Sequence, residues 1–332
     1  MKMPRRLIED LERRIASVKP DLDLLEERFS SVVVGQDDFR IGLTTALLCS
    51  GHVLIEGVPG LAKTLAARTL ARCVETSFSR LQFTPDLLPT DLTGTMVFQP
   101  ETSTFIARKG PVFAQFILAD EINRAPAKVQ SALLEAMQER QVTFGGETHR
   151  LPEPFFVMAT QNPIEQEGTY PLPEAQVDRF LLKLKIDYPT AEEEMEILRR
   201  VGGGSIPSIS AVMTPERVLE LQRLSSEVVV EDAVMNYMVR LVSATRNPRQ
   251  SGLKDLEDLI SVGASPRGTL GLLAASRARA LIYGQPFVTP SLVKEVGHDV
   301  LRHRIIRSFE AEAEEVGVEE IIDRILDRIP VK

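Results

Sequence analysis

The first half of the chain alternates short apolar runs with segments of helical spacing. The apolar runs lie at residues 53–55, 116–119 and 155–160, and further strands are expected at residues 78–83 and 181–186, where apolar and polar residues mix. Short, nearly continuous apolar runs are typical of strands that are buried on both faces of a parallel sheet. Helical spacing between the runs follows Ala62 and extends over residues 127–140. This alternation predicts an α/β domain with a parallel sheet.

Two further segments interrupt the alternation and predict hairpins. Residues 96–98 and 104–107 flank the polar turn at residues 99–103, within a proline-rich stretch that separates two of the apolar runs. Residues 141–151 carry Gly145 and Gly146 between two alternating segments. Glycines at the centre of such a pattern favour the tight turns that join antiparallel strands.

The N-terminal segment has the spacing of an amphipathic helix over residues 5–18. Its apolar positions are Leu7, Ile8, Leu11, Ile15 and Val18. Because proline removes a backbone donor and clashes with the preceding turn, we expect Pro20 to end this helix. A second helix is expected from about residue 37 to residue 49.

Beyond residue 189 the strand signals fade and helix-start signals replace them. Thr190 and Glu193 form a capping box, and three later pairs place an N-cap residue before a proline: Thr214-Pro215, Ser265-Pro266 and Thr289-Pro290. Residues 318–329 have the pattern of a final amphipathic helix. We therefore predict two domains, residues 1–189 and 190–332, the second one helical, with a flexible joint at Gly202-Gly203-Gly204.

Composition restricts the class of protein. The 332 residues have a formal net charge of −8, and aromatic residues make up 5% of the chain without any tryptophan. An acidic chain with few aromatic residues gives no support to nucleic-acid binding. The two cysteines, Cys49 and Cys73, lack CxxC spacing, the N-terminus is too charged for a signal peptide, and no apolar run approaches about 18 residues. We expect a cytoplasmic protein without membrane spans.

The segment between residues 53 and 70 has the order strand, glycine-containing loop, helix. Residues 57–64 read GVPGLAKT, and such a loop lets backbone N–H groups approach phosphate oxygens at a helix N-terminus. Lys63 would meet the β- and γ-phosphates, and Thr64 would meet Mg²⁺. The loop departs from the strict P-loop pattern because Ala62 replaces the usual glycine before the lysine. A tight turn with a surface lysine is the alternative.

A second candidate site ends the apolar run at residues 116–119. Asp120 and Glu121 follow it directly, and ligands of open α/β sheets collect at the carboxyl ends of the strands. Asp120 would hold Mg²⁺, and Glu121 would orient and polarise an attacking water. Asn162 follows the run at residues 155–160, where its side chain could reach a γ-phosphate. A solvated turn is the alternative for the acids, and an ordinary strand exit for Asn162.

The motifs GVPGLAKT, FILADEINRA, ATQNP, LPEAQVDRF and SPRG, in this order and spacing, resemble the MoxR family of AAA+ ATPases. The similarity is close from about residue 34 to residue 180 and looser to the C-terminus, and alanine before the lysine is usual for this family. The resemblance implies a P-loop AAA+ core, in which a five-stranded parallel sheet lies between helices, followed by an all-α lid domain.

The resemblance also implies the roles of individual residues. Asp120 and Glu121 correspond to Walker B, Asn162 to sensor 1, Arg179 to the arginine finger and Arg267 to sensor 2. Thr64 and Asp120 would hold the metal. We expect the nucleotide to be bound by Walker A and the residue after it: Gly57, Val58, Pro59, Gly60, Leu61, Ala62, Lys63, Thr64 and Leu65.

The function that the resemblance implies is ATP hydrolysis with Mg²⁺ at the subunit interfaces of a ring, usually a hexamer. Turnover would drive chaperone-like remodelling or maturation of a client protein, with metal insertion as one possibility and a protein with a von Willebrand factor A domain as adaptor. Arg124 could also reach the interface. A nucleic-acid-dependent motor and an ATP-binding scaffold without turnover are the alternatives, although the acidic composition disfavours the first and the intact acid pair the second.

Overall fold

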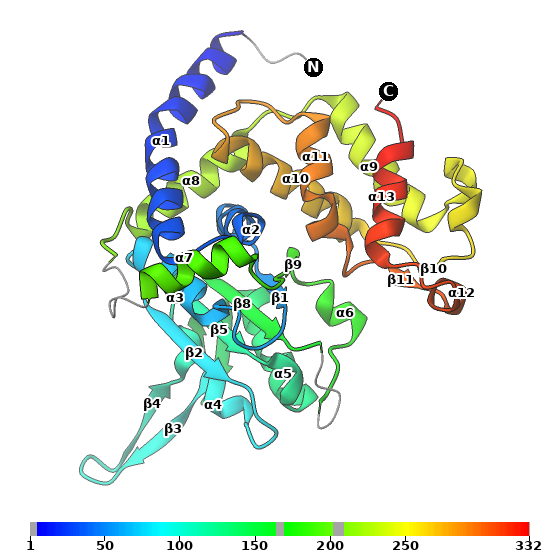
Figure 1. Cartoon of the computed structure of the whole chain (residues 1–332). Coiled ribbons are helices and arrows are strands. Elements are labelled where there is room, and N and C mark those ends of the chain that lie inside the picture. The colour runs from blue at the N-terminus through cyan, green and yellow to red at the C-terminus, as the bar shows by residue number, and fades with distance from the viewer. Residues whose placement is uncertain (1–4, 164–168, 202–208, 332) are drawn as a thin grey trace.

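The computed structural model describes residues 5–163, 169–201 and 209–331. Its centre is a five-stranded parallel sheet with the strand order β2-β5-β8-β1-β9 (Figure 1). All five predicted strands are confirmed, with these bounds: β1 (Val53–Glu56), β2 (Phe78–Gln82), β5 (Phe116–Asp120), β8 (Phe156–Gln161) and β9 (Leu182–Lys185).

Successive residues of the central strands point to opposite faces of the sheet, and both faces are buried. In β5, Phe116 and Leu118 belong to one apolar cluster, whereas Ile117 and Ala119 belong to another. Helices α1 (Arg5–Val32), α2 (Asp37–Leu48) and α3 (Lys63–Cys73) contribute to the first cluster. Helices α4 (Pro89–Thr93) and α5 (Ala127–Glu139) contribute to the second. Burial on both faces explains why these strands read as continuous apolar runs.

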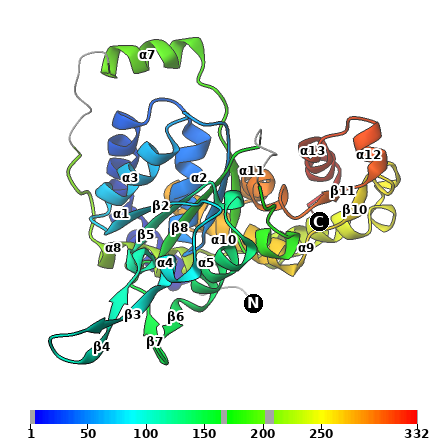
Figure 2. The same cartoon turned by 90° about the horizontal axis from the view of Figure 1, so that it is seen from below.

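Both predicted hairpins are present and project from the same side of the molecule (Figure 2). One consists of β3 (Gly94–Gln99) and β4 (Thr104–Lys109), the other of β6 (Gln141–Phe144) and β7 (Glu147–Arg150). They touch where the turn at Gly145 packs against the side chain of Met96, since a Cβ atom at Gly145 would lie 2.5 Å from its sulfur. The first hairpin exposes Phe98, Phe105 and Ile106 to solvent.

The second half of the described chain is mostly helical, as the capping signals predict. Thr214, Ser265 and Thr289 each accept a hydrogen bond from a backbone N–H of the helix that they precede. Thr190 and Glu193 form the expected reciprocal capping box. The helices are α6 (Glu174–Val177), α7 (Ala191–Val201), α8 (Pro215–Glu227), α9 (Asp232–Arg246), α10 (Pro266–Ile282), α11 (Pro290–Leu301), α12 (Phe309–Ala313) and α13 (Val318–Arg328).

The helical half also contains a short antiparallel ribbon that the sequence pattern does not predict. It pairs β10 (Ile260–Val262) with β11 (Ile306–Arg307). Strands of two or three residues are too short to show a period of two, so only the approach of two distant segments reveals them. The predicted joint at residues 202–204 lies outside the described residues. The division of the chain at residue 189 stays a prediction.

The expectation that Pro20 ends the first helix is wrong. Helix α1 continues through Pro20 to Val32. The apolar stripe also continues, because Leu22, Leu25 and Phe29 are buried in the cluster that covers the sheet. An interior proline costs roughly 3 kcal/mol, which the burial of three large side chains, at about 1.5–3 kcal/mol each, more than offsets.

Within the described ranges, no helix combines the length and the apolar character needed to cross a membrane. Cys49 and Cys73 are free thiols.

Burial of His52, directly before β1, makes the stability of the fold depend on pH. Its Nδ1 accepts a hydrogen bond from the Val157 N–H, and its Nε2 lies 3.2 Å from the Met137 carbonyl oxygen. Burial, with a smaller contribution from the charge of Arg140, lowers the pKa of His52 to about 3. The folded ring therefore stays neutral where the unfolded ring, with a pKa of about 6.5, binds a proton.

We expect His52 to cost about 2 kcal/mol of folding free energy between pH 7 and pH 5, because only the unfolded state gains a proton in that window. Urea unfolding at both pH values measures the loss, and His52→Gln, which cannot titrate, should lose about that much less than the unmodified chain. An equal loss in both proteins would contradict the assignment.

Candidate functional site

The loop between β1 and α3 has the backbone geometry of a phosphate cradle. Gly57 packs against the end of β9, where a Cβ atom would lie 2.9 Å from the Ile186 carbonyl oxygen. Gly60 has a φ of 89°, which favours glycine. Ala62 also takes a left-handed conformation, with a φ of 54°, directly before the first turn of α3. The loop thus tolerates an alanine at a strained position, at a cost of about 1 kcal/mol.

A cavity of about 420 Å³ lies between this loop and the carboxyl ends of β5 and β8. Lys63 and Thr64 line it on one side, and Asp120, Glu121 and Asn162 line it on the other. Lys63 is partly buried and donates a hydrogen bond to the Gly57 carbonyl oxygen. Burial lowers the pKa of Lys63, while Asp120 and Glu121 act in the opposite direction. The tertiary structure therefore gathers residues 59–65, the predicted Walker B acids and Asn162 around one cavity, whereas Gly57 and Val58 do not line it.

Both oxygens of the Asp120 carboxylate have partners in the protein. Oδ1 accepts a hydrogen bond of 2.6 Å from the Thr160 hydroxyl. Oδ2 accepts two from Arg80, at 2.6 Å from Nη2 and 3.1 Å from Nε. Asp120 is therefore fixed in orientation and paired with a positive charge.

Glu121 is held separately from Asp120 by its backbone and by two donors. Its φ of 56° and ψ of 50° are left-handed, and its N–H donates to the Thr160 hydroxyl at 2.8 Å. Its Oε2 accepts hydrogen bonds from Gln82 at 2.7 Å and from Arg124 at 2.9 Å. A strained backbone at the end of a buried strand turns this carboxylate away from its neighbour and into the cavity.

The donors around the cavity suit a hard divalent cation. Mg²⁺ prefers oxygen ligands and is commonly bound through one or two protein oxygens, water and phosphate. Thr64 offers a hydroxyl and Asp120 a carboxylate to the same cavity. Thr64 and Asp120 therefore have the chemistry of a Mg²⁺ site.

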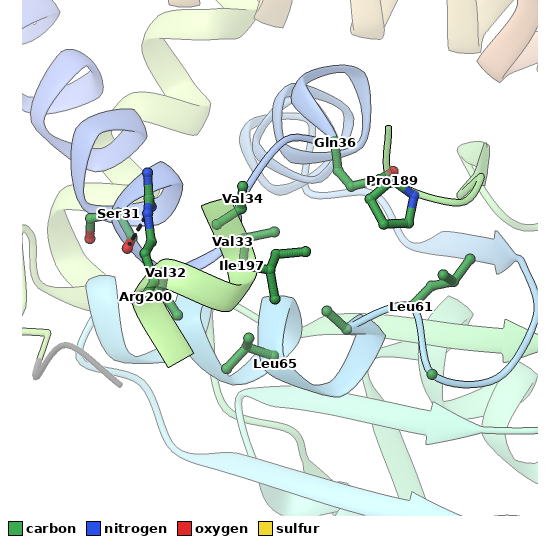
Figure 3. Close-up of a pocket in the computed structure, with 12 residues that line it drawn as sticks. Ser31, Val32, Val33, Val34, Gln36, Leu61, Leu65, Pro189, Ile197 and Arg200 are labelled. Atoms are coloured by element: carbon green, nitrogen blue, oxygen red, sulfur yellow. Dashed lines mark hydrogen bonds between the residues drawn. The ribbon is translucent and has the colours of Figure 1, made fainter. Parts of the chain in front are cut away.

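A second pocket, of about 190 Å³, lies on the other side of the phosphate loop (Figure 3). Val33, Val34, Leu61, Leu65 and Ile197 supply apolar side chains to its lining. The pocket shares part of the loop, residues 60–62 and 65, with the cavity that holds Lys63. A planar apolar ring joined to a phosphate chain could therefore occupy both.

Helix α7 lines one side of this second pocket with Ile197 and Arg200. Arg200 donates hydrogen bonds to the carbonyl oxygens of Ser30 and Ser31, at 2.9 and 3.0 Å, near the end of α1. Gln36 donates to the Asp187 carbonyl oxygen at 2.9 Å and so ties the segment before α2 to the end of β9. Val33 and Val34, in the turn before Gln36, therefore form part of the pocket wall.

Arg179 and Arg267 do not line either of the two cavities beside the phosphate loop. Arg267 lies instead beside Asp178, the residue before Arg179, and the Asp178 carboxylate is 3.7 Å from Arg267 and accepts hydrogen bonds of 2.9 Å from Arg304 and Ser265. Among the described residues, the Arg179 guanidinium has no hydrogen-bonding or ion-pairing partner. Both arginines are thus absent from the lining of the two cavities, and Arg267 is tied to the segment that carries Arg179.

The motifs assign no role to three residues of the site: Arg80, Gln82 and Thr160. Arg80 and Gln82 lie two positions apart on β2 and so share one face of the strand. Gln82 is opposite Asp120 in the parallel register. Two polar residues at alternate positions of a strand indicate partners for the acids of a neighbouring strand, but only once the pairing of β2 with β5 is known.

Comparison with known proteins gives a consistent result. A model of the ATPase family associated with various cellular activities (AAA) matches residues 52–182, and a model of the AAA lid domain matches residues 254–325. Chaperone MoxR1 of Mycobacterium tuberculosis is 49% identical over 97% of this chain and 82% of its own length. Protein MoxR of Paracoccus denitrificans is 34% identical over 92% of this chain and 95% of its own length. The crystal structure of a candidate ATPase from Cytophaga hutchinsonii has a TM-score of 0.92 and 44% identity, and the match covers 98% of both chains.

We expect Lys63→Ala to weaken binding of a fluorescent ATP analogue by about 10- to 100-fold, because a charge-assisted hydrogen bond is worth roughly 1.5–3 kcal/mol. Fluorescence titration measures the affinity. Lys128→Ala is the matched control, because Lys128 is exposed on α5 and does not line the cavity. Equal affinities of the two variants would remove Lys63 from the phosphate site.

Proposed function

The chain belongs to the MoxR family of AAA+ ATPases, and we propose that it hydrolyses ATP at the interfaces between the subunits of a ring. The observation that carries the proposal is the division of charge within one subunit. Lys63, Asp120 and Glu121 line one cavity, whereas Arg179 and Arg267 do not line it and Arg267 pairs with Asp178. Half of the positive field that phosphoryl transfer needs would then come from a second copy of the chain.

In this proposal the protein positions the reactants and neutralises developing charge. Backbone N–H groups of residues 57–64 and the Lys63 ammonium bind the phosphates. Thr64 and Asp120 hold Mg²⁺, which when bound neutralises charge on the phosphate oxygens. Glu121, oriented by Gln82 and Arg124, holds the attacking water. Asn162 at the end of β8 is placed to contact the γ-phosphate or that water.

Arg179 and Arg267 act on the nucleotide of the neighbouring subunit in this scheme. Asp178 would hold both segments in place. It accepts hydrogen bonds from Arg304 and Ser265 and so connects the segment that carries Arg179 to the start of α10. Arg304 is itself buried, and burial lowers its pKa to about 10, so that it stays charged at neutral pH. Because Arg179 precedes β9 and Arg267 lies in the first turn of α10, the contacts of Asp178 would hold the two arginines at a fixed spacing.

The turnover would drive remodelling or maturation of a client protein. The exposed apolar side chains of Phe98, Phe105 and Ile106 on the β3–β4 hairpin support a protein client rather than a nucleic acid. The curated relative from M. tuberculosis is named a chaperone. A hexameric ring, a cytoplasmic setting, a von Willebrand factor A domain adaptor and metal insertion into a client belong to the same proposal.

We expect Glu121→Gln to bind ATP with unchanged affinity and to lose turnover by about 10²- to 10⁴-fold, because a positioned base contributes about that much. Phosphate release with excess ATP measures turnover. Glu135→Gln, on the exposed side of α5, is the control for charge removal without contact to the cavity. Full turnover in Glu121→Gln would refute the role of this residue.

We expect Arg179→Ala to lose turnover by about 10³- to 10⁵-fold, the usual effect of removing an arginine finger. Mixing it with Lys63→Ala should restore part of the activity, because some interfaces then combine an intact Arg179 with an intact Lys63. Two differently tagged variants show by co-purification that mixed rings form. Mixed rings without any recovery would contradict action across the interface.

A further inference from the structure

Arg80 forms an ion pair with Asp120, the carboxylate that the proposed function assigns to Mg²⁺. Its guanidinium binds Asp120 Oδ2 through two hydrogen bonds, while Thr160 occupies Oδ1. Arg80 lines the same cavity as Lys63 and Thr64. A side chain of the protein therefore neutralises the charge of Asp120.

The contact also links Asp120 to the second acid of the site. The same Arg80 nitrogen, Nη2, donates to Gln82 Oε1 at 3.0 Å. Gln82 in turn donates to Glu121 at 2.7 Å. An uninterrupted series of hydrogen bonds thus runs from one carboxylate through Arg80 and Gln82 to the other. Each of the two carboxylates thus has a partner within the protein, whereas the proposed reaction needs Asp120 to face Mg²⁺.

Asp120 cannot keep this contact and also face a metal with the same oxygen. We propose that Arg80 is a positioning residue that competes with Mg²⁺ for Asp120, so that its guanidinium has to leave Oδ2 before Asp120 can face the metal. The proposal rests on the proposed function. Two physical effects support it: one carboxylate oxygen is shared, and a guanidinium repels a divalent cation at short range.

The two partners differ in their freedom to move. The Arg80 side chain is 47% exposed, whereas that of Asp120 is 13% exposed and is held by Thr160. Arg80 also lies on β2, an edge strand of the sheet, so solvent is available to its displaced guanidinium. Arg80 is therefore the partner that leaves. Because a pair with one exposed member contributes little, releasing it should weaken metal binding only modestly.

The experiment measures how strongly Mg²⁺ enhances nucleotide binding, without any turnover. Fluorescent MANT-ADP is titrated into the full chain with EDTA and with Mg²⁺, and the ratio of the two dissociation constants is the Mg²⁺ factor. We expect Arg80→Ala to raise this factor by about 3- to 10-fold, because Asp120 no longer has a competing cation. Affinity in EDTA should stay within about twofold of the unmodified chain.

Three further variants make the test specific. Arg80→Gln removes the charge with a smaller change in volume, and should raise the Mg²⁺ factor as Arg80→Ala does, even if the alanine variant folds poorly. Arg80→Lys keeps the charge but loses the two-pronged contact, so an intermediate factor is expected. Arg223→Ala, on the exposed surface of α8, should leave the factor unchanged.

Two results would overturn the proposal while leaving the proposed function intact. An unchanged Mg²⁺ factor in Arg80→Ala and Arg80→Gln would make the contact a structural ion pair only. A lower affinity in EDTA with an unchanged factor would make Arg80 a phosphate ligand instead. Failure of the unmodified chain to bind MANT-ADP under any condition would overturn the proposed function as well, so the two failures are distinguishable.

Discussion

Two adjacent carboxylates at the end of a buried strand are the constraint on which the functional edge of the sheet depends. Asp120 and Glu121 end β5 between two neighbouring strands, where like charges repel and solvent is limited. The fold meets this constraint with donors from both neighbours. β8 contributes Thr160, which contacts Asp120 and the Glu121 backbone, and β2 contributes Arg80 and Gln82. The two neighbouring strands thus hold the acid pair in a defined orientation.

The same edge carries a balancing positive charge that is costly to keep there. Burial lowers the pKa of Lys63, and only the nearby acids act against that effect. A lysine that is held charged by carboxylates, beside a loop of open N–H groups, is a strong attractor for phosphate. Removing the acids would leave Lys63 without compensation, whereas Asp120 and Glu121 also pair with Arg80 and Arg124.

A different interaction joins the core to the helices that follow it. Asp178 contacts Arg304 and Ser265 and lies near Arg267, so the segment before β9 is fixed to the start of α10. Arg304 adds contacts to the Phe180 and Leu181 carbonyl oxygens. This buried set of charge-assisted hydrogen bonds is a rigid connection.

The sequence by itself determined the sheet strands, both hairpins, the helix caps of the second half and the family. These features depend on local chemistry: apolar runs, glycine turns, an N-cap before a proline, and motifs whose residues are close in the chain. Except for Arg80, it also identified the residues that line the cavity beside Lys63, because parallel strands bring their carboxyl ends to one edge.

Only the tertiary structure decided what depends on contacts between distant segments. Pro20 stays inside α1 because Leu22, Leu25 and Phe29 find a core, which no local rule registers. Arg80 acquires its contact with Asp120 only through the pairing of β2 with β5. Arg267 lies beside Asp178 rather than at the phosphate loop because Ser265, directly before α10, is hydrogen-bonded to Asp178. Spacing along the chain fixes which side chains share an element, but packing fixes which elements meet.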